Sequence, residues 1–191
     1  MKVPQLRKKT EIKSCHNVTW EDNYSWIHQE DILQVLKNKD KLNPEVKEYL
    51  IQENKYTDFH LKDTKNLQKK LFDEIKGKIK LDDESLPYRD HDYDYWTKTT
   101  AKGNYSIKLR KKIGSNKTEE IWNGDKEKKK LGVEYFGVGD LEVSHDDKFL
   151  AYSLDIQGSE YYTIYVREII SNDVVTRKIP DTSGSITFSL D

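Results

Sequence analysis

The second half of the chain is a succession of short β-type segments separated by tight turns, and this pattern restricts the fold more than any other feature. Residues 93–99 are rich in aromatic and β-branched side chains, and residues 105–110 alternate with a period of two. Three further segments follow in the same way, at 149–154, 161–166 and 174–178, with turns at 157–159 and 172–173. Strands and tight turns in this succession predict an antiparallel meander.

A short internal repeat indicates the kind of meander. Ser144 and Asp146 precede the segment 149–154, and Ser189 and Asp191 repeat their spacing about 45 residues later. A repeat of about 40–50 residues with about four short strands is typical of a β-propeller blade. The second copy stops before the turn and strand that follow the first. We therefore expect the chain to hold part of a longer propeller.

The first eighty residues instead have the sequence pattern of helices. Asn43 is suited to cap a helix that begins at Pro44, and apolar side chains then follow helical spacing. Asp63 or Thr64 is expected to cap a second helix, which Gly77 ends in a left-handed conformation. A shorter helix is expected near residues 32–36. Helices this short are marginal by themselves, so they must pack on something.

The two textures together predict an α+β fold with two parts. Residues 1–80 form an N-terminal helical segment. Residues 81–191 form the first antiparallel blades of an incomplete β-propeller, about two blades and the start of a third.

The overall charge and the lack of long apolar runs exclude several classes of protein. With 33 Lys and Arg against 34 Asp and Glu, the chain lacks the positive excess that nucleic acids or anionic membranes attract. It has no run of about 18 apolar residues, and its first fifteen residues have no apolar stretch of the kind that a secretory signal needs. Its single cysteine, Cys15, excludes an intramolecular disulfide. We expect a cytoplasmic protein with no nucleic-acid or membrane partner.

A set of short motifs runs in order along the chain. They are Asp22, Tyr24 and Trp26, followed by the stretches 44–54, 71–83, 143–153, 158–160 and 182–185. In this order the motifs resemble the start of the prolyl oligopeptidase family, in particular its oligopeptidase B (protease II) branch. The match extends from about residue 16 to the last residue. His145 departs from the family motif, which usually has Pro at this place.

This resemblance implies the beginning of a two-part enzyme. In the family an N-terminal helical segment packs on an α/β-hydrolase domain. A seven-bladed propeller is inserted between the two in sequence, covers the active site and admits only short peptides. Oligopeptidase B relatives cleave after Lys or Arg. The catalytic Ser, Asp and His lie in the hydrolase domain, so the resemblance implies that this chain lacks the triad and is inactive alone.

The serines of the chain agree with that implication. A nucleophile of this class sits on a sharp turn marked G-x-S-x-G, because flanking glycines let the backbone bend tightly. Ser115, Ser159 and Ser185 each follow a glycine but lack this frame, and we interpret them as turn residues. Gly137 and Gly139 are too few for a dinucleotide fingerprint, and a loop is expected there. We predict no catalytic, cofactor-binding or metal-binding residue, and no cofactor.

The histidines and charge runs have plain interpretations. None of the five histidines is paired at a spacing that brings two imidazoles to one face. His91 lies among Asp90, Asp92 and Asp94, but alternate strand residues face opposite ways, so a solvated edge is favoured over a metal site. The basic runs 108–112 and 126–130 and the acidic runs 82–84 and 90–94 are expected in solvated loops or strand edges. Alternatively, the acidic runs attract basic peptides.

Three hypotheses about function follow. The chain is an inactive N-terminal portion of an oligopeptidase B-like peptidase, or one chain of a split peptidase completed by a separately encoded hydrolase part. The third alternative is a free-standing binding module built on propeller strands. An incomplete propeller exposes a blade face and a sheet edge, so we expect the isolated chain to be poorly stable or self-associating.

Overall fold

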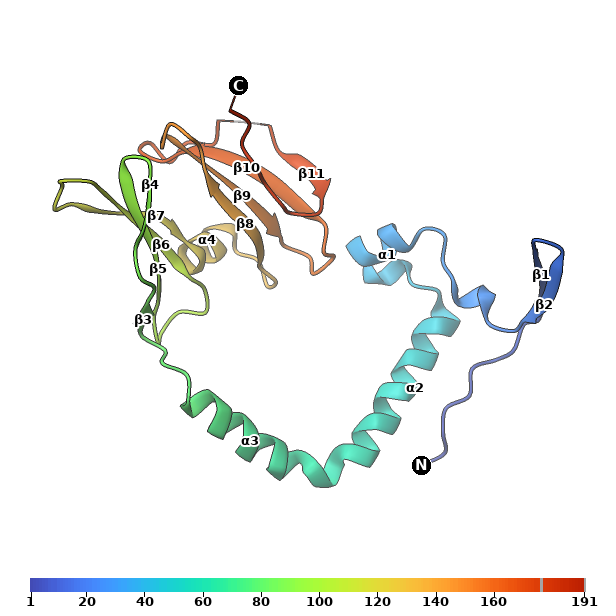
Figure 1. The fold of residues 1–191 in the computed structure, drawn as a ribbon. Coiled ribbons are helices and arrows are strands. Elements are labelled where there is room, and N and C mark those ends of the chain that lie inside the picture. Colours follow the sequence, from blue (N-terminus) through green and yellow to red (C-terminus); the bar gives the residue numbers. More distant parts are fainter. Residues whose placement is uncertain (176, 191) are drawn as a thin grey trace. The chain divides into compact units, whose positions relative to one another are not determined.

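The computed structural model of the chain describes residues 1–175 and 177–190 (Figure 1). It divides into two compact units, residues 1–78 and 79–191, close to the change of texture in the sequence. No helix in the described ranges is long and apolar enough to cross a membrane.

The first unit begins with a β-hairpin that the sequence analysis missed. Strands β1 (Glu11–Cys15) and β2 (Val18–Asp22) pair antiparallel. His16 and Asn17 make the two-residue turn with positive φ angles of 47° and 64°, the geometry that matches the strand twist. The expectation of helices alone over residues 1–80 is therefore wrong at this place.

The rest of the first unit is helical, as predicted. Its elements are η1 (Ser25–Ile27), α1 (Ile32–Lys37), η2 (Lys39–Lys41), α2 (Pro44–Leu61), η3 (Lys62–Thr64) and α3 (Lys65–Gly77). The cap of α2 is confirmed, because the Asn43 side chain accepts hydrogen bonds from the amides of Glu45 at 2.9 Å and Val46 at 3.4 Å.

Two expected helix ends differ from the structure. Thr64 precedes α3, but its hydroxyl donates to the carbonyl of Leu61 at 2.7 Å and caps no amide. The reason is that η3 continues from α2, so the amides at the start of α3 are not those of a free helix end. Gly77 is the last residue of α3, with right-handed Lys78 following it.

The second unit consists of two antiparallel sheets (Figure 1). The first contains β3 (Asp83–Glu84), β4 (Tyr88–Asp90), β5 (Tyr93–Thr99), β6 (Ile107–Lys112) and β7 (Thr118–Asn123). The second contains β8 (Gly137–Val143), β9 (Phe149–Asp155), β10 (Tyr162–Glu168) and β11 (Ile179–Thr182). Consecutive strands from β5 to β7 and from β8 to β11 are neighbours, which confirms the predicted meanders.

The last strand lies later in the chain than predicted. The turn at Asn172 forms, with φ at 65°, and the Val175 amide donates to the Val166 carbonyl at 2.9 Å. The register then shifts, and the regular strand is β11 rather than residues 174–178, because extra residues are accommodated as an irregularity. Thr176 of the predicted strand and Asp191 of the predicted repeat lie outside the described residues.

The hydrophobic core of the second unit lies between its two sheets. Buried side chains form one cluster: Trp122, Phe136, Leu150, Tyr152 and Leu154. The rings of Trp122 and Tyr152, one from each sheet, are 5.0 Å apart. β9 is buried on its other face too, where the Ser153 hydroxyl donates to the carbonyl of Gly184 at 2.6 Å. In a strand that is buried on both faces, every side chain must be apolar or have its polar atoms hydrogen-bonded.

Two buried arginines connect the sheets. Arg110 on β6 donates to Glu119 at 2.9 Å and to the carbonyl of Asp147, in the turn before β9. Arg167 on β10 donates to the carbonyl of Ile121 at 2.9 Å and pairs with Glu127. Arg110 thus bonds both within its own sheet and beyond it, whereas both partners of Arg167 lie outside its own sheet, and each charge is compensated where it is buried.

The burial of Arg110 corrects the expectation of a solvated basic run at residues 108–112. β6 lies between β5 and β7, so it is not an edge, and only 2% of Arg110 is exposed. Lys108 extends toward β8 and donates to the carbonyl of Leu141 at 3.2 Å. Burial lowers the pKa of Lys108 from its usual value.

The second basic run is also different from the expectation, because it forms helix α4 (Gly124–Leu131). Asn123 caps this helix by accepting from the Lys126 amide at 3.1 Å, and Gly132 ends it with a left-handed φ of 65°. Acidic residues lie in its first turn and lysines in its last, which suits the helix dipole. Asn123 and Gly132 are local sequence signals typical of the two ends of a helix.

We predict that Arg167→Met destabilises the second unit by about 3–5 kcal/mol, because the substitution leaves the carboxylate of Glu127 buried without its partner. Urea unfolding followed by tryptophan fluorescence measures the change. Lys98→Met, which removes an exposed ion pair with Glu84, is the matched control and should change stability by less than about 0.5 kcal/mol. Equal effects of the two substitutions would contradict the prediction.

Candidate functional site

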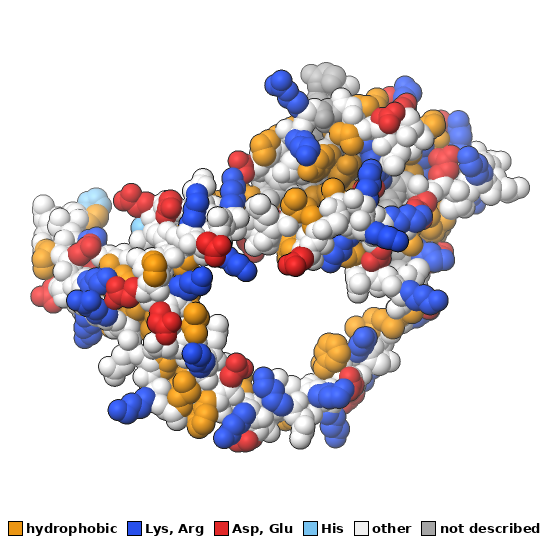
Figure 2. Space-filling view, turned by 180° about the vertical axis from the view of Figure 1, so that it is seen from behind, with side chains coloured by type: hydrophobic (Ala, Val, Ile, Leu, Met, Phe, Trp, Pro, Cys, Tyr) orange, Lys and Arg blue, Asp and Glu red, His pale blue; other side chains and the backbone are white. Residues whose placement is uncertain are grey.

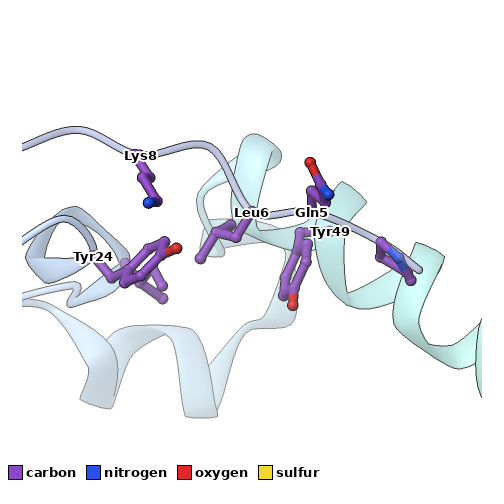
Figure 3. A pocket seen from close by; sticks show the side chains of 7 residues that line it. Gln5, Leu6, Lys8, Tyr24 and Tyr49 are labelled. Atoms are coloured by element: carbon purple, nitrogen blue, oxygen red, sulfur yellow. The ribbon is translucent and has the colours of Figure 1, made fainter. Parts of the chain in front are cut away.

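The first unit contains an open groove of about 770 Å³ beneath the N-terminal segment (Figure 3). It is lined by Pro4, Gln5, Leu6, Lys8, Tyr24, Ile27 and Tyr49. In Figure 3 the side chain of Leu6 lies between the rings of Tyr24 and Tyr49. The groove therefore combines apolar and aromatic side chains with the polar groups of Gln5 and Lys8.

The segment that forms one wall of the groove is held by specific bonds. The indole nitrogen of Trp26 donates to the carbonyl of Arg7 at 3.0 Å, and the Lys9 amide donates to the carbonyl of Asn23 at 3.0 Å. The Lys9 ammonium lies 2.6 Å from Glu45 and 3.9 Å from the centre of the Trp26 ring. These contacts fix the segment against η1 and α2.

The groove offers contacts for binding rather than groups for hydrolysis. The seven lining residues all belong to the described part of the chain, and among them Lys8 carries a charge. The Tyr49 phenol donates to Glu53 at 2.5 Å, and this hydrogen bond raises its pKa. A phenol held in the neutral form is a poor base at neutral pH.

The three serines that follow glycines have turn roles. The Ser115 hydroxyl accepts from the Lys117 amide at 3.0 Å, and the Ser159 hydroxyl contacts Asp155 at 3.4 Å. Ser185 follows Gly184, whose φ is 91°. These placements suit the interpretation as turn residues, and the absence of a nucleophile from the chain stays a prediction.

The pair of glycines at 137 and 139 lies in a strand and not in the expected loop. β8 begins at Gly137. A Cβ atom at Gly139 would lie 2.5 Å from the Ser153 hydroxyl oxygen, so glycine is needed for close packing of neighbouring strands. This packing role explains the glycine without any phosphate ligand.

The histidines differ most from the sequence-based expectation. His91 and His145 lie together, with ring centres 5.9 Å apart and ring planes at 87°. His91 lies in the turn between β4 and β5, with φ at 45°, so strand alternation does not apply to it. Asp90 lies 3.3 Å from its Nδ1 atom, whereas Asp94 bonds Arg89 at 3.1 Å. Within residues 1–175 and 177–190, no three or more potential ligands gather as a metal-binding group.

The acidic run at residues 82–84 is exposed, as expected, but its charges have local partners. Asp82 accepts from the amide of Ala101 at 2.9 Å. Asp83 pairs with Lys80 at 2.7 Å and Glu84 with Lys98 at 2.8 Å. These lysines offset much of the negative field that a basic peptide would meet.

The repeated Ser-x-Asp motif closes the turn between β8 and β9. The Ser144 hydroxyl donates to Asp146 at 2.7 Å and accepts from the Phe149 amide at 2.9 Å. Asp146 also pairs with Lys148 at 2.9 Å. Hydrogen bonds from Lys148 and then Ser144 lower the pKa of Asp146 to about 2.

Helix α3 carries an apolar stripe with no cover. Leu67, Leu71, Phe72 and Ile75 follow helical spacing and are 46–62% exposed. α3 lies wholly within the described part of the chain and buries none of its side chains. Figure 2 shows hydrophobic side chains at the surface of the helical segment. Such a stripe normally packs on another surface.

Comparison with known protein families identifies the family to which the chain belongs. Residues 4–189 match the family described as prolyl oligopeptidase, N-terminal beta-propeller domain. The chain belongs to this family. The resemblance predicted from the motifs is thereby confirmed, and the match begins earlier than the predicted residue 16.

Related proteins agree with this assignment. Dipeptidyl aminopeptidase BI of Pseudoxanthomonas mexicana is 29% identical over 98% of this chain and 27% of its own length. Protease 2 of Moraxella lacunata is 22% identical over 95% of this chain and 25% of its own length. The chain therefore spans about a quarter of the length of these family members.

Solved structures share the fold. Oligopeptidase B from Leishmania major has a TM-score of 0.79 and 22% identity over 99% of this chain and 28% of its own. Oligopeptidase B from Trypanosoma brucei has a TM-score of 0.78 and 21% identity over 100% of this chain and 28% of its own. The helices and antiparallel sheets of the present chain thus have the same fold as the corresponding part of oligopeptidase B.

We predict that the exposed stripe of α3 makes the isolated chain associate with itself. Sedimentation velocity should detect oligomers, and the double substitution Leu71→Lys and Phe72→Lys should reduce them because charge on the stripe opposes apolar contact. Asn66→Lys, at an exposed position on the opposite face of the same helix, is the control. A monodisperse monomer with a cooperative thermal transition would contradict the prediction.

A second prediction concerns the pH dependence of the β8–β9 turn. Because folding lowers the Asp146 pKa, its carboxylate stabilises the fold above about pH 4, and this contribution is lost as the pH falls toward 2. Lys148→Ala should raise the pKa most and Ser144→Ala less, as followed by NMR titration of the Asp146 carboxyl carbon. Lys117→Ala, on another turn, should leave it unchanged. An ordinary Asp pKa in the unsubstituted chain would refute this account.

Proposed function

We propose that this chain forms the N-terminal part of an oligopeptidase B-like serine peptidase. Residues 1–80 are the helical segment that packs on the α/β-hydrolase domain, and residues 81–191 begin an incomplete propeller with about two blades and the start of a third. The observation that carries the proposal is the family match over residues 4–189, in a chain that spans about a quarter of its relatives' length.

The uncovered surfaces of the structure support this assignment. The α3 stripe exposes about half of each apolar side chain, and apolar surface of this kind is stabilised by burial at roughly 25 cal/mol per Å². In the proposed enzyme the hydrolase domain covers the stripe. The catalytic Ser, Asp and His belong to that domain, so the chain alone is inactive.

Two specificities are candidates for the complete enzyme. The resemblance of the sequence motifs to the oligopeptidase B (protease II) branch favours cleavage of short basic peptides after Lys or Arg. The 29% identity to a protein named dipeptidyl aminopeptidase favours release of dipeptides from a free N-terminus. We favour the first, with the cytoplasm as its location. The acidic runs are a weaker source of basic specificity, because residues 82–84 have local partners.

Two further arrangements are distinguished by where the hydrolase part is encoded. In a split peptidase, a separate chain supplies it and associates with this one. In a free-standing binding module, no hydrolase part exists. The coding sequence downstream decides, because a reading frame with G-x-S-x-G followed by Asp and His supports a peptidase.

We predict that the chain alone does not hydrolyse N-terminally blocked arginine amides, and that hydrolysis appears when the downstream hydrolase part is supplied. A hydrolase part with its G-x-S-x-G serine changed to alanine is the control. Activity that requires a free N-terminus would instead support the dipeptidyl specificity. Absence of any downstream hydrolase sequence, or activity of this chain alone, would overturn the proposal.

A further inference from the structure

We propose that His91 and His145 form a binding site for a divalent transition-metal ion of the zinc, copper or nickel type. The two residues come from different sheets of the second unit. His91 lies in the turn between β4 and β5, and His145 in the turn between β8 and β9. A metal ion bound by both imidazoles would cross-link the two sheets.

The ring geometry suits a shared metal. An imidazole nitrogen lies about 2.0–2.1 Å from zinc, so each ring centre lies about 3.2 Å away and two ring centres lie about 5–6 Å apart. The ring centres of His91 and His145 are 5.9 Å apart, with planes at 87°. Imidazole is a preferred ligand for zinc, copper and nickel.

A neighbouring carboxylate supports the ligand role of His91. Asp90 lies 3.3 Å from Nδ1 of His91. A carboxylate that accepts from one ring nitrogen of a metal-binding histidine fixes the ring and leaves the other nitrogen for the metal, and Asp90 lies close enough to take this role. Carboxylate–histidine–metal arrangements of this kind are common around metal ions in proteins.

The two turns are held together by bonds that do not involve the imidazoles. The Tyr95 phenol donates to the Asp147 carboxylate at 2.7 Å, and Arg110 donates to the Asp147 carbonyl. Burial, together with the bond to Asp147, raises the pKa of Tyr95, so the phenol stays a donor. The turn that carries His145 is thus held in place before an ion binds, which reduces the cost of ordering the site.

The surroundings set the character of the site. Both histidines are exposed, so water can reach a bound ion and complete its coordination. The described residues supply no group of three or more ligands here, so we expect a two-histidine site with water as the remaining ligands. Asp146, next to His145, pairs with Lys148 at 2.9 Å.

The test is calorimetric titration of the untagged chain with zinc chloride, with magnesium chloride as the comparison. We expect one zinc ion per chain and no comparable binding of magnesium, which prefers oxygen ligands. His91→Asn and His145→Asn should each weaken zinc binding about 10-fold or more, and Asp90→Asn should weaken it about 10-fold. His60→Asn, on α2 of the other unit, is the matched control and should change nothing.

A second measurement separates loss of the site from loss of the fold. Zinc should raise the thermal midpoint of the unsubstituted chain, since a ligand of the native state stabilises it, and should have little effect on either histidine variant. Circular dichroism without metal shows whether each variant keeps its strands. Zinc binding that is unchanged in a folded His91→Asn or His145→Asn variant, or lost equally in His60→Asn, would overturn the proposal.

Discussion

The second unit depends on the burial of aromatic side chains between its two sheets. Trp122 from the first sheet and Tyr152 from the second lie in contact, and Leu150 and Leu154 extend the same cluster along β9. Aromatic rings of this size contribute most of the area that a small core removes from water. Because a strand carries side chains on both faces, this cluster also determines which residues of β9 face away from it.

Polar contacts then fix how the sheets meet. Apolar packing tolerates small sliding movements, whereas a buried guanidinium is stable only when its partners lie at specific positions. Arg167 satisfies this requirement on β7 and α4, and Arg110 does so at the turn before β9. The bond from Arg110 to the Asp147 carbonyl joins the first sheet to the turn that carries His145, and His145 lies beside His91.

The first unit is stabilised differently. Helix α2 has a good N-terminal cap and α3 has local ion pairs, yet Val46 is the one buried residue of α2 and the apolar side chains of α3 are exposed. Local capping and exposed ion pairs contribute only about 1 kcal/mol each or less, which does not replace a core. For this reason we expect the helices of the first unit to pack against another protein surface.

Features that depend on near neighbours in the chain could be predicted from the amino acids. These are the meander strands, the cap at Asn43, the turn at Asn172 and the motifs that identify the family. The tertiary structure alone decided that Arg110 is buried and that His91 meets His145, since both depend on contacts between residues far apart in the chain. Periodicity and turn chemistry act over a few residues, whereas the position of one sheet against another is set by packing of the whole core.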